Sequence, residues 1–163
     1  MAGDVRLVPV DDKTLEPLLS IAAAEAEPDD VMPPVEAPAG WSHARREAFR
    51  DFHRAHYGGL EGPTRTLMYA IMLGGEVVGM IRLARRDEPG VMETGMWLGR
   101  SARGQGIAVA ALREALTEAA GHGARVVVAE TTAGNTPAIG VLTRCGAVLR
   151  RDGDDVHAEI VID

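Results

Sequence analysis

The sequence predicts one α/β domain over residues 1–163, in which about four helices flank a mixed, mainly antiparallel sheet of about six or seven strands. Three observations support this prediction. Runs of β-prone residues alternate along the chain with runs of helical periodicity. Two glycine-containing turns lie between β-prone runs, as they do in hairpins. A glycine-rich turn also lies between one predicted strand and the longest predicted helix.

The N-terminal third predicts one strand followed by two helices. Residues 5–8 form an extended apolar run, and leucine and alanine then recur at helical spacing over residues 15–22. Four prolines between positions 28 and 38 predict an extended loop, because proline cannot continue a helix. Ser42 can cap the second helix, since its hydroxyl can accept from a free backbone N–H of the first turn. The pair Gly58-Gly59 ends that helix.

Three β-prone segments in the middle of the chain predict adjacent antiparallel strands. Residues 66–73 and 77–83 are separated by a Gly-Gly dipeptide, which tolerates the positive φ angles of a tight hairpin turn. Residues 91–98 alternate between two faces, with Glu93 on the face opposite Met92. This segment is predicted to be a third strand of the same sheet.

The C-terminal half predicts two helices and three strands. A helix of about four turns runs from Gly106 until Gly121. Residues 126–128 are continuously apolar and β-branched, which favours a central strand covered on both faces. Asn135 and Pro137 are suited to the start of a short helix, and an Asp-Gly-Asp turn joins the last two strands.

Composition and charge limit the possible functions. The formal net charge of −7 repels a nucleic-acid backbone and mildly favours a cationic partner such as an amine, although many soluble proteins are acidic without such a partner. Cys145 is the only cysteine, so no internal disulfide can form and we expect a cytoplasmic protein. The chain shows no signal-peptide pattern and no apolar run of ~20 residues, so we expect no membrane insertion.

The turn from Arg103 to Ala108 is the strongest candidate for a binding site. It opens a helix, where the first four backbone N–H groups lack internal partners and the helix dipole attracts anions. Glycines at this point let phosphate oxygens reach the backbone. The alternative is a strand-to-helix connection that binds nothing. A phosphate loop of the Walker type is excluded because its Gly-Lys-Ser/Thr ending is absent, and a dinucleotide fingerprint fits poorly.

This segment resembles the GNAT superfamily of N-acetyltransferases. The family signature Gln/Arg-x-x-Gly-x-Gly/Ala is matched by Arg103, Gly106 and Ala108, within the segment GMWLGRSARGQGIAVAAL. A second segment, GNTPAIGVLTRCGA, is similar to the asparagine-headed helix on the other side of the family's cofactor. The pairs Trp-Leu and Val-Leu in these two segments look like the RimJ/RimL-type branch.

The resemblance implies a GNAT-like fold and an N-acetyltransferase that uses acetyl-coenzyme A as cosubstrate, without a metal. It implies that the turn supplies amides to the pyrophosphate, that a strand pairs its backbone with the pantetheine arm, and that an asparagine binds the arm's amide or caps a helix. The residues implied in cofactor binding are Met96, Trp97, Leu98, Arg103, Gly104, Gln105, Gly106, Ile107, Ala108 and Asn135.

Acetyl transfer needs a neutral amine, and an alkylamine with a pKa near 10.4 costs about 4.6 kcal/mol to deprotonate at pH 7. Glu93 is the candidate catalytic base, acting directly or through water, while the alternative is a carboxylate paired with a nearby arginine. Many relatives carry a tyrosine as general acid where this chain and RimJ/RimL-like relatives have leucine, here Leu142, so the thiolate is expected to leave without a side-chain donor or with water. Cys145 is expected to be an apolar filler and not a catalytic thiol.

The acceptor is not identified by any motif. We expect its pocket to be built from the first two helices, the proline-rich loop and the hairpin near Gly74, with His56 and Tyr57 as weak candidates to line it. The acceptor classes left open are a protein N-terminal amine, an aminoglycoside-like antibiotic, a polyamine and an amino acid. A non-catalytic coenzyme A-binding sensor, or another nucleotide-binding module, is the alternative to an enzyme. A homodimer is possible.

Overall fold

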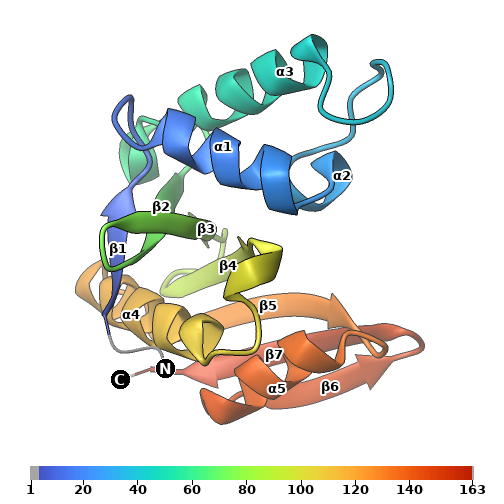
Figure 1. The fold of residues 1–163 in the computed structure, drawn as a ribbon. Helices are drawn as coiled ribbons and strands as arrows, with labels where there is room; N and C mark the ends of the chain where they lie inside the picture. Colours follow the sequence, from blue (N-terminus) through green and yellow to red (C-terminus); the bar gives the residue numbers. More distant parts are fainter. Residues whose placement is uncertain (1–3, 163) are drawn as a thin grey trace.

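The computed structural model describes residues 4–162, so residues 1–3 and 163 of the predicted domain lie outside the described part of the chain. It contains a seven-stranded sheet in the order β1-β2-β3-β4-β5-β7-β6 (Figure 1). All neighbouring strands are antiparallel except β4 and β5, which confirms the mixed, mainly antiparallel sheet. The strands are β1 Val5–Pro9, β2 Thr66–Leu73, β3 Glu76–Arg85, β4 Val91–Leu98, β5 Val126–Thr132, β6 Val148–Asp152 and β7 Asp155–Val161.

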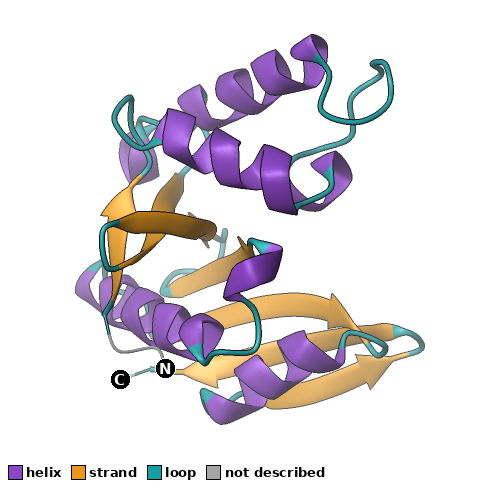
Figure 2. Cartoon of the chain, in the orientation of Figure 1, coloured by secondary structure: helices purple, strands orange, loops and turns teal. Residues whose placement is uncertain are grey.

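Helices cover both faces of this sheet (Figure 2). Four of them follow the sequence-based prediction, and Ser42 caps α3 as expected, accepting from Arg45 N. The helix does not extend to Gly58-Gly59 but ends at Arg54, and a separate 3₁₀ turn follows. The helices are α1 Leu15–Glu25, α2 Pro28–Val31, α3 His43–Arg54, α4 Ile107–Gly121 and α5 Thr136–Arg144, with 3₁₀ turns η1 Gly59–Glu61 and η2 Arg100–Ala102.

The short helix α2 corrects the prediction of an extended loop between the prolines at 28 and 38. Pro28 occupies the first helical position, where its missing N–H has no intrahelical acceptor to lose and its fixed φ suits the helix. Pro28 and Val31 are buried, so packing holds this single turn. The prediction of an extended loop is therefore wrong only at the start of the segment, where Pro28 begins a helix.

Two apolar clusters hold the helices to the sheet. The cluster on the α4 and α5 side includes core residues of β2, β3 and β4 together with Val127 of β5 and Ile160 of β7. The cluster on the α1 and α3 side includes residues of β2, β3 and β4, such as Met80 and Trp97, and none of β5, β6 or β7 among the described residues. The second cluster therefore covers only one half of the sheet.

This unequal cover corrects a second prediction. We expected the strand at residues 126–128 to be covered on both faces, but Val127 is buried while Val126 and Val128 are only half-buried. Val148 and Val161, on neighbouring strands, are 74% and 66% exposed. The strand is central in the sheet but has a helix layer on one side only, because α4 and α5 both lie on that side.

Strands β4 and β5 separate soon after they begin to pair. Their parallel register covers only residues 91–93 of β4 and 126–128 of β5. From Thr94 to Leu98, β4 pairs with β3 alone. One edge of β4 is thus free over the stretch that leads to the glycine-rich turn.

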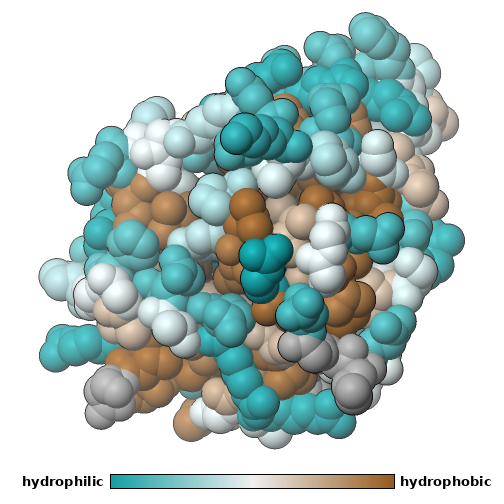
Figure 3. Space-filling model, turned by 60° about the vertical axis from the view of Figure 1, so that its left-hand side comes forward, coloured by the Kyte–Doolittle hydropathy of each residue, from teal (hydrophilic) through white to brown (hydrophobic). Residues whose placement is uncertain are grey.

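The surface shows polar and apolar residues intermixed. On the face in Figure 3, hydrophobic residues appear in several separate patches between hydrophilic ones. Within residues 4–162, no helix has both the length and the apolar character to cross a bilayer.

Candidate functional site

The glycine-rich turn presents a row of free backbone amides. Gly104 and Gly106 have φ angles of +75° and +78°, in the left-handed region that residues with a Cβ rarely adopt. The N–H groups from Gly104 to Val109 have no hydrogen-bond acceptor among the described residues, and the first bonded amide of α4 is Ala110 N, 3.2 Å from Gly106 O. These amides lie at the positive end of a 15-residue helix, so the turn is suited to bind an anion.

Side chains fold back to hold this turn in place. Arg103 Nε donates to Leu98 O at 3.3 Å, and Gln105 Nε2 donates to Ser101 O at 2.8 Å. From α1, the carboxylate of Glu25 accepts from Ser101 N at 2.6 Å and from Ser101 Oγ at 3.0 Å. The bond from the Ser101 amide lowers the pKa of Glu25 below its usual value. Sequence reasoning missed Glu25, because no local signal links it to a turn so far along the chain.

The free edge of β4 offers further backbone groups. Gly99 N donates to Val78 O of β3 at 2.8 Å, and successive residues of a strand point their peptide groups to alternate edges. Met96 and Leu98 therefore direct their peptide groups away from β3, toward the opening beside β5. Trp97 directs its peptide groups toward β3, where it pairs with Met80. Of these three predicted residues, Met96 and Leu98 are the two whose backbone can meet a ligand in that opening, Leu98 through its N–H because its carbonyl already accepts from Arg103 Nε.

Asn135 lies at the start of α5, directly beyond β5. Its side-chain oxygen accepts from Ala138 N at 3.3 Å, so the helix-cap role is confirmed. Its role as a cofactor ligand stays a prediction. Leu142, the apolar residue expected in place of a tyrosine, is buried in the core. Cys145 is half-buried, and burial raises the pKa of its thiol.

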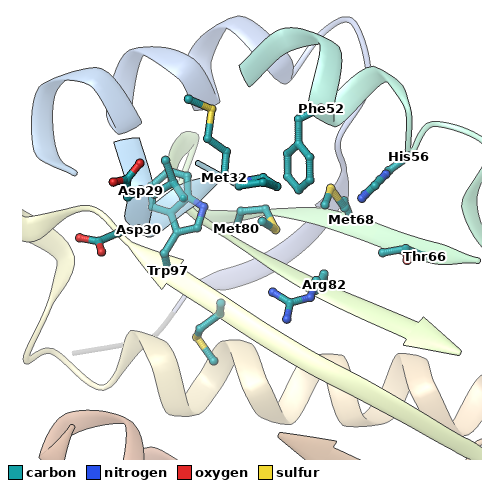
Figure 4. Close-up of a pocket in the computed structure, with 13 residues that line it drawn as sticks. Asp29, Asp30, Met32, Phe52, His56, Thr66, Met68, Met80, Arg82 and Trp97 are labelled. Carbon is teal, nitrogen blue, oxygen red and sulfur yellow. The ribbon is translucent and has the colours of Figure 1, made fainter. Parts of the chain in front are cut away.

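A pocket of about 420 Å³ lies on the other side of β4, between the sheet and helices α2 and α3 (Figure 4). Phe52 and several methionines supply the apolar part of its lining, whereas Asp29 and Asp30 stand at one side. Met96 extends the lining to the free edge of β4. The lining residues are Asp29, Asp30, Val31, Met32, Pro33, Phe52, His56, Thr66, Met68, Met80, Arg82, Met96 and Trp97.

The pocket partly follows the predicted acceptor region. Residues of α3 and of the proline-rich segment, which includes α2, line it, but the first predicted helix, α1, and the hairpin at Gly74 do not. His56 lines it, whereas Tyr57 is directed elsewhere and donates its hydroxyl to Asp12 at 3.2 Å. Burial lowers the pKa of His56 below its usual value, and the charge of Arg82 adds to this effect. Burial in the lining thus disfavours the charged form of this imidazole.

Glu93 is held by Arg82 on the pocket face of the sheet. Arg82 Nη2 lies 2.9 Å from Glu93 Oε2, and Arg82 Nε lies 3.3 Å from Oε1. The guanidinium lies against Gly95, where an added Cβ would overlap it. The structure therefore contains the carboxylate–arginine pair that was the alternative interpretation of Glu93. The role of Glu93 as a base stays a prediction.

Two buried polar atoms at the pocket have no hydrogen-bond partner within residues 4–162. They are Trp97 Nε1 and His56 Nδ1. The other tryptophan differs, because Trp41 Nε1 donates to Ala26 O at 2.9 Å. Figure 4 shows the indole nitrogen of Trp97 turned toward the middle of the lining side chains. An unpaired buried donor is costly, which indicates a site for an acceptor group.

A model of the acetyltransferase (GNAT) family matches residues 26–147 of this chain. Among solved structures, Mycobacterium smegmatis RimJ in complex with CoA-disulfide is 24% identical, with a TM-score of 0.77, 98% of this chain covered and 83% of that chain. RimL, a ribosomal alpha-N-protein acetyltransferase in complex with coenzyme A, is 21% identical, with a TM-score of 0.74 and coverage of 99% and 96%. Campylobacter jejuni PseH, an N-acetyltransferase in complex with acetyl coenzyme A, is 10% identical, with a TM-score of 0.70 and coverage of 98% and 99%. No curated protein sequence matches this chain.

Proposed function

This chain belongs to the acetyltransferase (GNAT) family, and on that premise we propose that it moves an acetyl group from acetyl-coenzyme A to a primary amine by direct attack in a ternary complex. The observation that carries the proposal is the row of free amides from Gly104 to Val109 at the start of α4. Several charge-assisted hydrogen bonds to one pyrophosphate are available there, because the two glycines keep Cβ atoms out of the turn. The coenzyme A complexes of RimJ and RimL and the acetyl coenzyme A complex of PseH support the same cosubstrate.

The residues present fit the remainder of such a cosubstrate. Arg103, Gly104, Gln105, Gly106, Ile107 and Ala108 would hold the pyrophosphate, and Asn135 would meet the pantetheine arm from the β5 side. Met96 and Leu98 would pair with the arm along the free edge of β4. An N–H near Leu98 would also stabilise negative charge on the thioester oxygen, as in an oxyanion hole.

In the proposed reaction the amine nitrogen forms a bond to the acetyl carbon as the carbon–sulfur bond breaks. Glu93 accepts the proton that the amine loses, directly or through a water molecule. Because Arg82 occupies part of the Glu93 carboxylate, the proton transfer must use the oxygen lone pairs that remain. The departing thiolate needs no side-chain acid, since a thiol with a pKa of ~8.5 costs only about 2 kcal/mol as the anion at pH 7.

We further propose that the chain belongs to the RimJ/RimL-like branch of the family. The Trp97-Leu98 pair at the end of β4 and Leu142 in α5 support this placement, and RimJ and RimL are among the similar solved structures. The acceptor would then be a small-molecule amine or a protein N-terminus.

Calorimetry with acetyl-coenzyme A, coenzyme A and ATP tests the cosubstrate. We expect the first two to bind and ATP not to bind, because the turn lacks the lysine of a Walker loop. Absence of acetyl-coenzyme A binding in a folded protein would refute the proposal. Release of free thiol with a panel of amines then tests turnover, and binding without any release would favour the non-catalytic sensor.

A further inference from the structure

The indole nitrogen of Trp97 marks a missing hydrogen-bond acceptor in the pocket. The side chain is only 9% exposed, and its Nε1 has no partner among the described residues. A buried Trp N–H usually finds a partner, as Trp41 does with Ala26 O. The nitrogen faces the other lining side chains in Figure 4 and has less than 1 Å² of accessible surface, so an oxygen of a bound molecule satisfies it once a flexible neighbour such as a methionine moves aside.

The apolar side chains of the lining favour an apolar group on the bound molecule. Met32, Met68 and Met80 line the pocket together with Phe52. Thioether and aromatic side chains pack well on aromatic rings and adapt to their shape. A pocket of about 420 Å³ lies at the lower end of the range of ligand sites, so it suits a small molecule.

The charges of the pocket attract a cation. Asp29 and Asp30 are exposed at the pocket and form no ion pair within the described chain. The only positive lining residue, Arg82, is matched by Glu93. Two carboxylates are therefore left over, which favours an ammonium group and disfavours a free carboxylate.

The proposed function requires the acceptor amine to lose its proton before attack. Its proposed base, Glu93, is paired with Arg82, which makes the carboxylate less available for that proton. An amine beside a carbonyl group reduces that demand. If its pKa is near 8, as for an α-amino group, roughly 200-fold more of it is neutral at pH 7 than of an alkylamine.

We propose, on the basis of the proposed function, that the acceptor is a small α-amino carbonyl compound with an aromatic or large apolar side chain and no free carboxylate, such as an amino acid amide or ester. Its carbonyl oxygen accepts from Trp97 Nε1, and its side chain packs on Phe52 and the methionines. Asp29 and Asp30 draw its ammonium form to the pocket. Free amino acids are disfavoured by their carboxylate, and polyamines lack the apolar body.

The test compares kcat/KM for acetyl transfer to five probes: phenylalaninamide, 2-phenylethylamine, phenylalanine, spermidine and a hexapeptide that begins with phenylalanine. We expect phenylalaninamide to be the best of the five. 2-Phenylethylamine lacks the carbonyl, phenylalanine adds the carboxylate, and spermidine lacks the ring. A higher kcat/KM for any other probe overturns the proposal, and a preference for the hexapeptide would move the acceptor class to polypeptides.

Substitutions separate the hydrogen bond from the general reactivity of the amine. Trp97→Phe should lower the ratio of phenylalaninamide to 2-phenylethylamine by about fivefold to tenfold, the value of one hydrogen bond. Trp41→Phe is the matched control and should leave the ratio unchanged, because Trp41 already has a partner. An unchanged ratio in Trp97→Phe contradicts the assignment of the carbonyl.

The charge is tested with Asp29→Asn combined with Asp30→Asn. This variant should reduce the discrimination between phenylalaninamide and phenylalanine, whereas Glu76→Gln combined with Glu114→Gln removes the same charge from exposed sites outside the lining and should not. Equal effects of the two variants would contradict a local role for the aspartates.

Failure of this inference differs from failure of the proposed function. If acetyl-coenzyme A binds and another amine is preferred, only the acceptor class is wrong. If acetyl-coenzyme A does not bind, the proposed function fails first. If it binds but no probe reacts, calorimetric binding of phenylalaninamide to the coenzyme A complex still tests the pocket, and no detectable binding refutes the inference.

Discussion

The two sides of β4 are built in different ways. On the side of the glycine-rich turn, the binding groups are backbone amides of consecutive residues, Gly104 to Val109. On the other side, the pocket is built from side chains of α2, α3, β2, β3 and β4, which are far apart in the sequence. A site made of local backbone follows from a short motif, whereas a site made of converging side chains depends on the whole fold.

This difference has a consequence for specificity. The amides of the turn cannot be changed by most substitutions, so the turn keeps its chemistry while its side chains vary. The pocket changes with each of its side chains. The predictions below test whether the two sides are as separate as this comparison indicates.

The largest expected effect is on the turn. Gly106→Glu introduces a side chain and a negative charge where φ is +78°, and should weaken coenzyme A binding by at least about 1,000-fold, the value of roughly two charge-assisted hydrogen bonds. Calorimetry measures the loss. Gly153→Glu is a matched control, because Gly153 also has a positive φ of +64° but lies in the β6–β7 turn. Equal affinity in the Gly106 variant and the wild type would remove the basis of the cosubstrate assignment.

The pocket side should be the more sensitive to acid. His53 is completely buried in α3, where its Nδ1 donates to Phe49 O at 2.8 Å, and burial lowers its pKa from 6.5 to about 4. The imidazole of His53 binds a proton less readily in the folded state than in the unfolded state. Above pH 6.5 this difference therefore does not reduce the free energy of unfolding. That free energy decreases as the pH falls from 6.5 to 4, by roughly 3 kcal/mol.

Denaturant unfolding at several pH values between 7.5 and 4.5 measures this decrease. His53→Leu should remove most of it, whereas His122→Leu, at an exposed position after α4, should retain it. The same pH dependence in wild type and His53→Leu would assign the effect to other groups.

The third effect concerns the proposed base, Glu93, which lies on the pocket face of β4. Glu93→Gln keeps the shape of the side chain but removes its proton affinity, so kcat should fall by about 100-fold. Glu130→Gln is the control, because Glu130 also contacts a side chain of a neighbouring strand, with His157 Nδ1 2.9 Å from its Oε1. The pH profile of kcat gives a second reading. Full turnover by Glu93→Gln would show that water alone, or another group, accepts the proton.

The smallest expected effect is on the free energy of unfolding when each of the two tryptophans is replaced in the ligand-free protein. Trp41→Phe should lower the free energy of unfolding by about 1 kcal/mol beyond the packing loss, because Ala26 O loses its donor. Trp97→Phe removes a donor that has no partner and should cost less. Thermal or denaturant unfolding measures both. A larger loss in Trp97→Phe would mean that its N–H is already satisfied in the free protein.

Much of the fold could be predicted because its signals are local. Alternation, hairpin glycines and the Ser42 cap depend on neighbouring residues, and the strands and four of the helices follow them. The turn at Gly106 was predictable for the same reason. The short helix at Pro28 was missed because proline both stops helices and starts them, and only the burial of Val31 decides between the two.

The rest of the candidate site could not be predicted in this way. Arg82 reaches Glu93 only because β3 and β4 are neighbours in register and Gly95 leaves room for the guanidinium. Asp29 and Asp30 belong to the pocket because α2 packs over the sheet. The continuous apolar run at residues 126–128 also predicted cover on both faces of that strand, since it cannot show that both C-terminal helices lie on one side.

The brief pairing of β4 with β5 has a mechanical consequence. Within residues 4–162, the strand pairing between the two halves of the sheet covers only residues 91–93 and 126–128, and the packing of α4 and α5 adds to it. A molecule bonded to the β4 edge and, beyond β5, to Asn135 would bridge these halves, and its binding energy would add to their cohesion by mass action. We therefore expect the loaded protein to resist heat and proteolysis better, with slowed amide exchange concentrated along this seam.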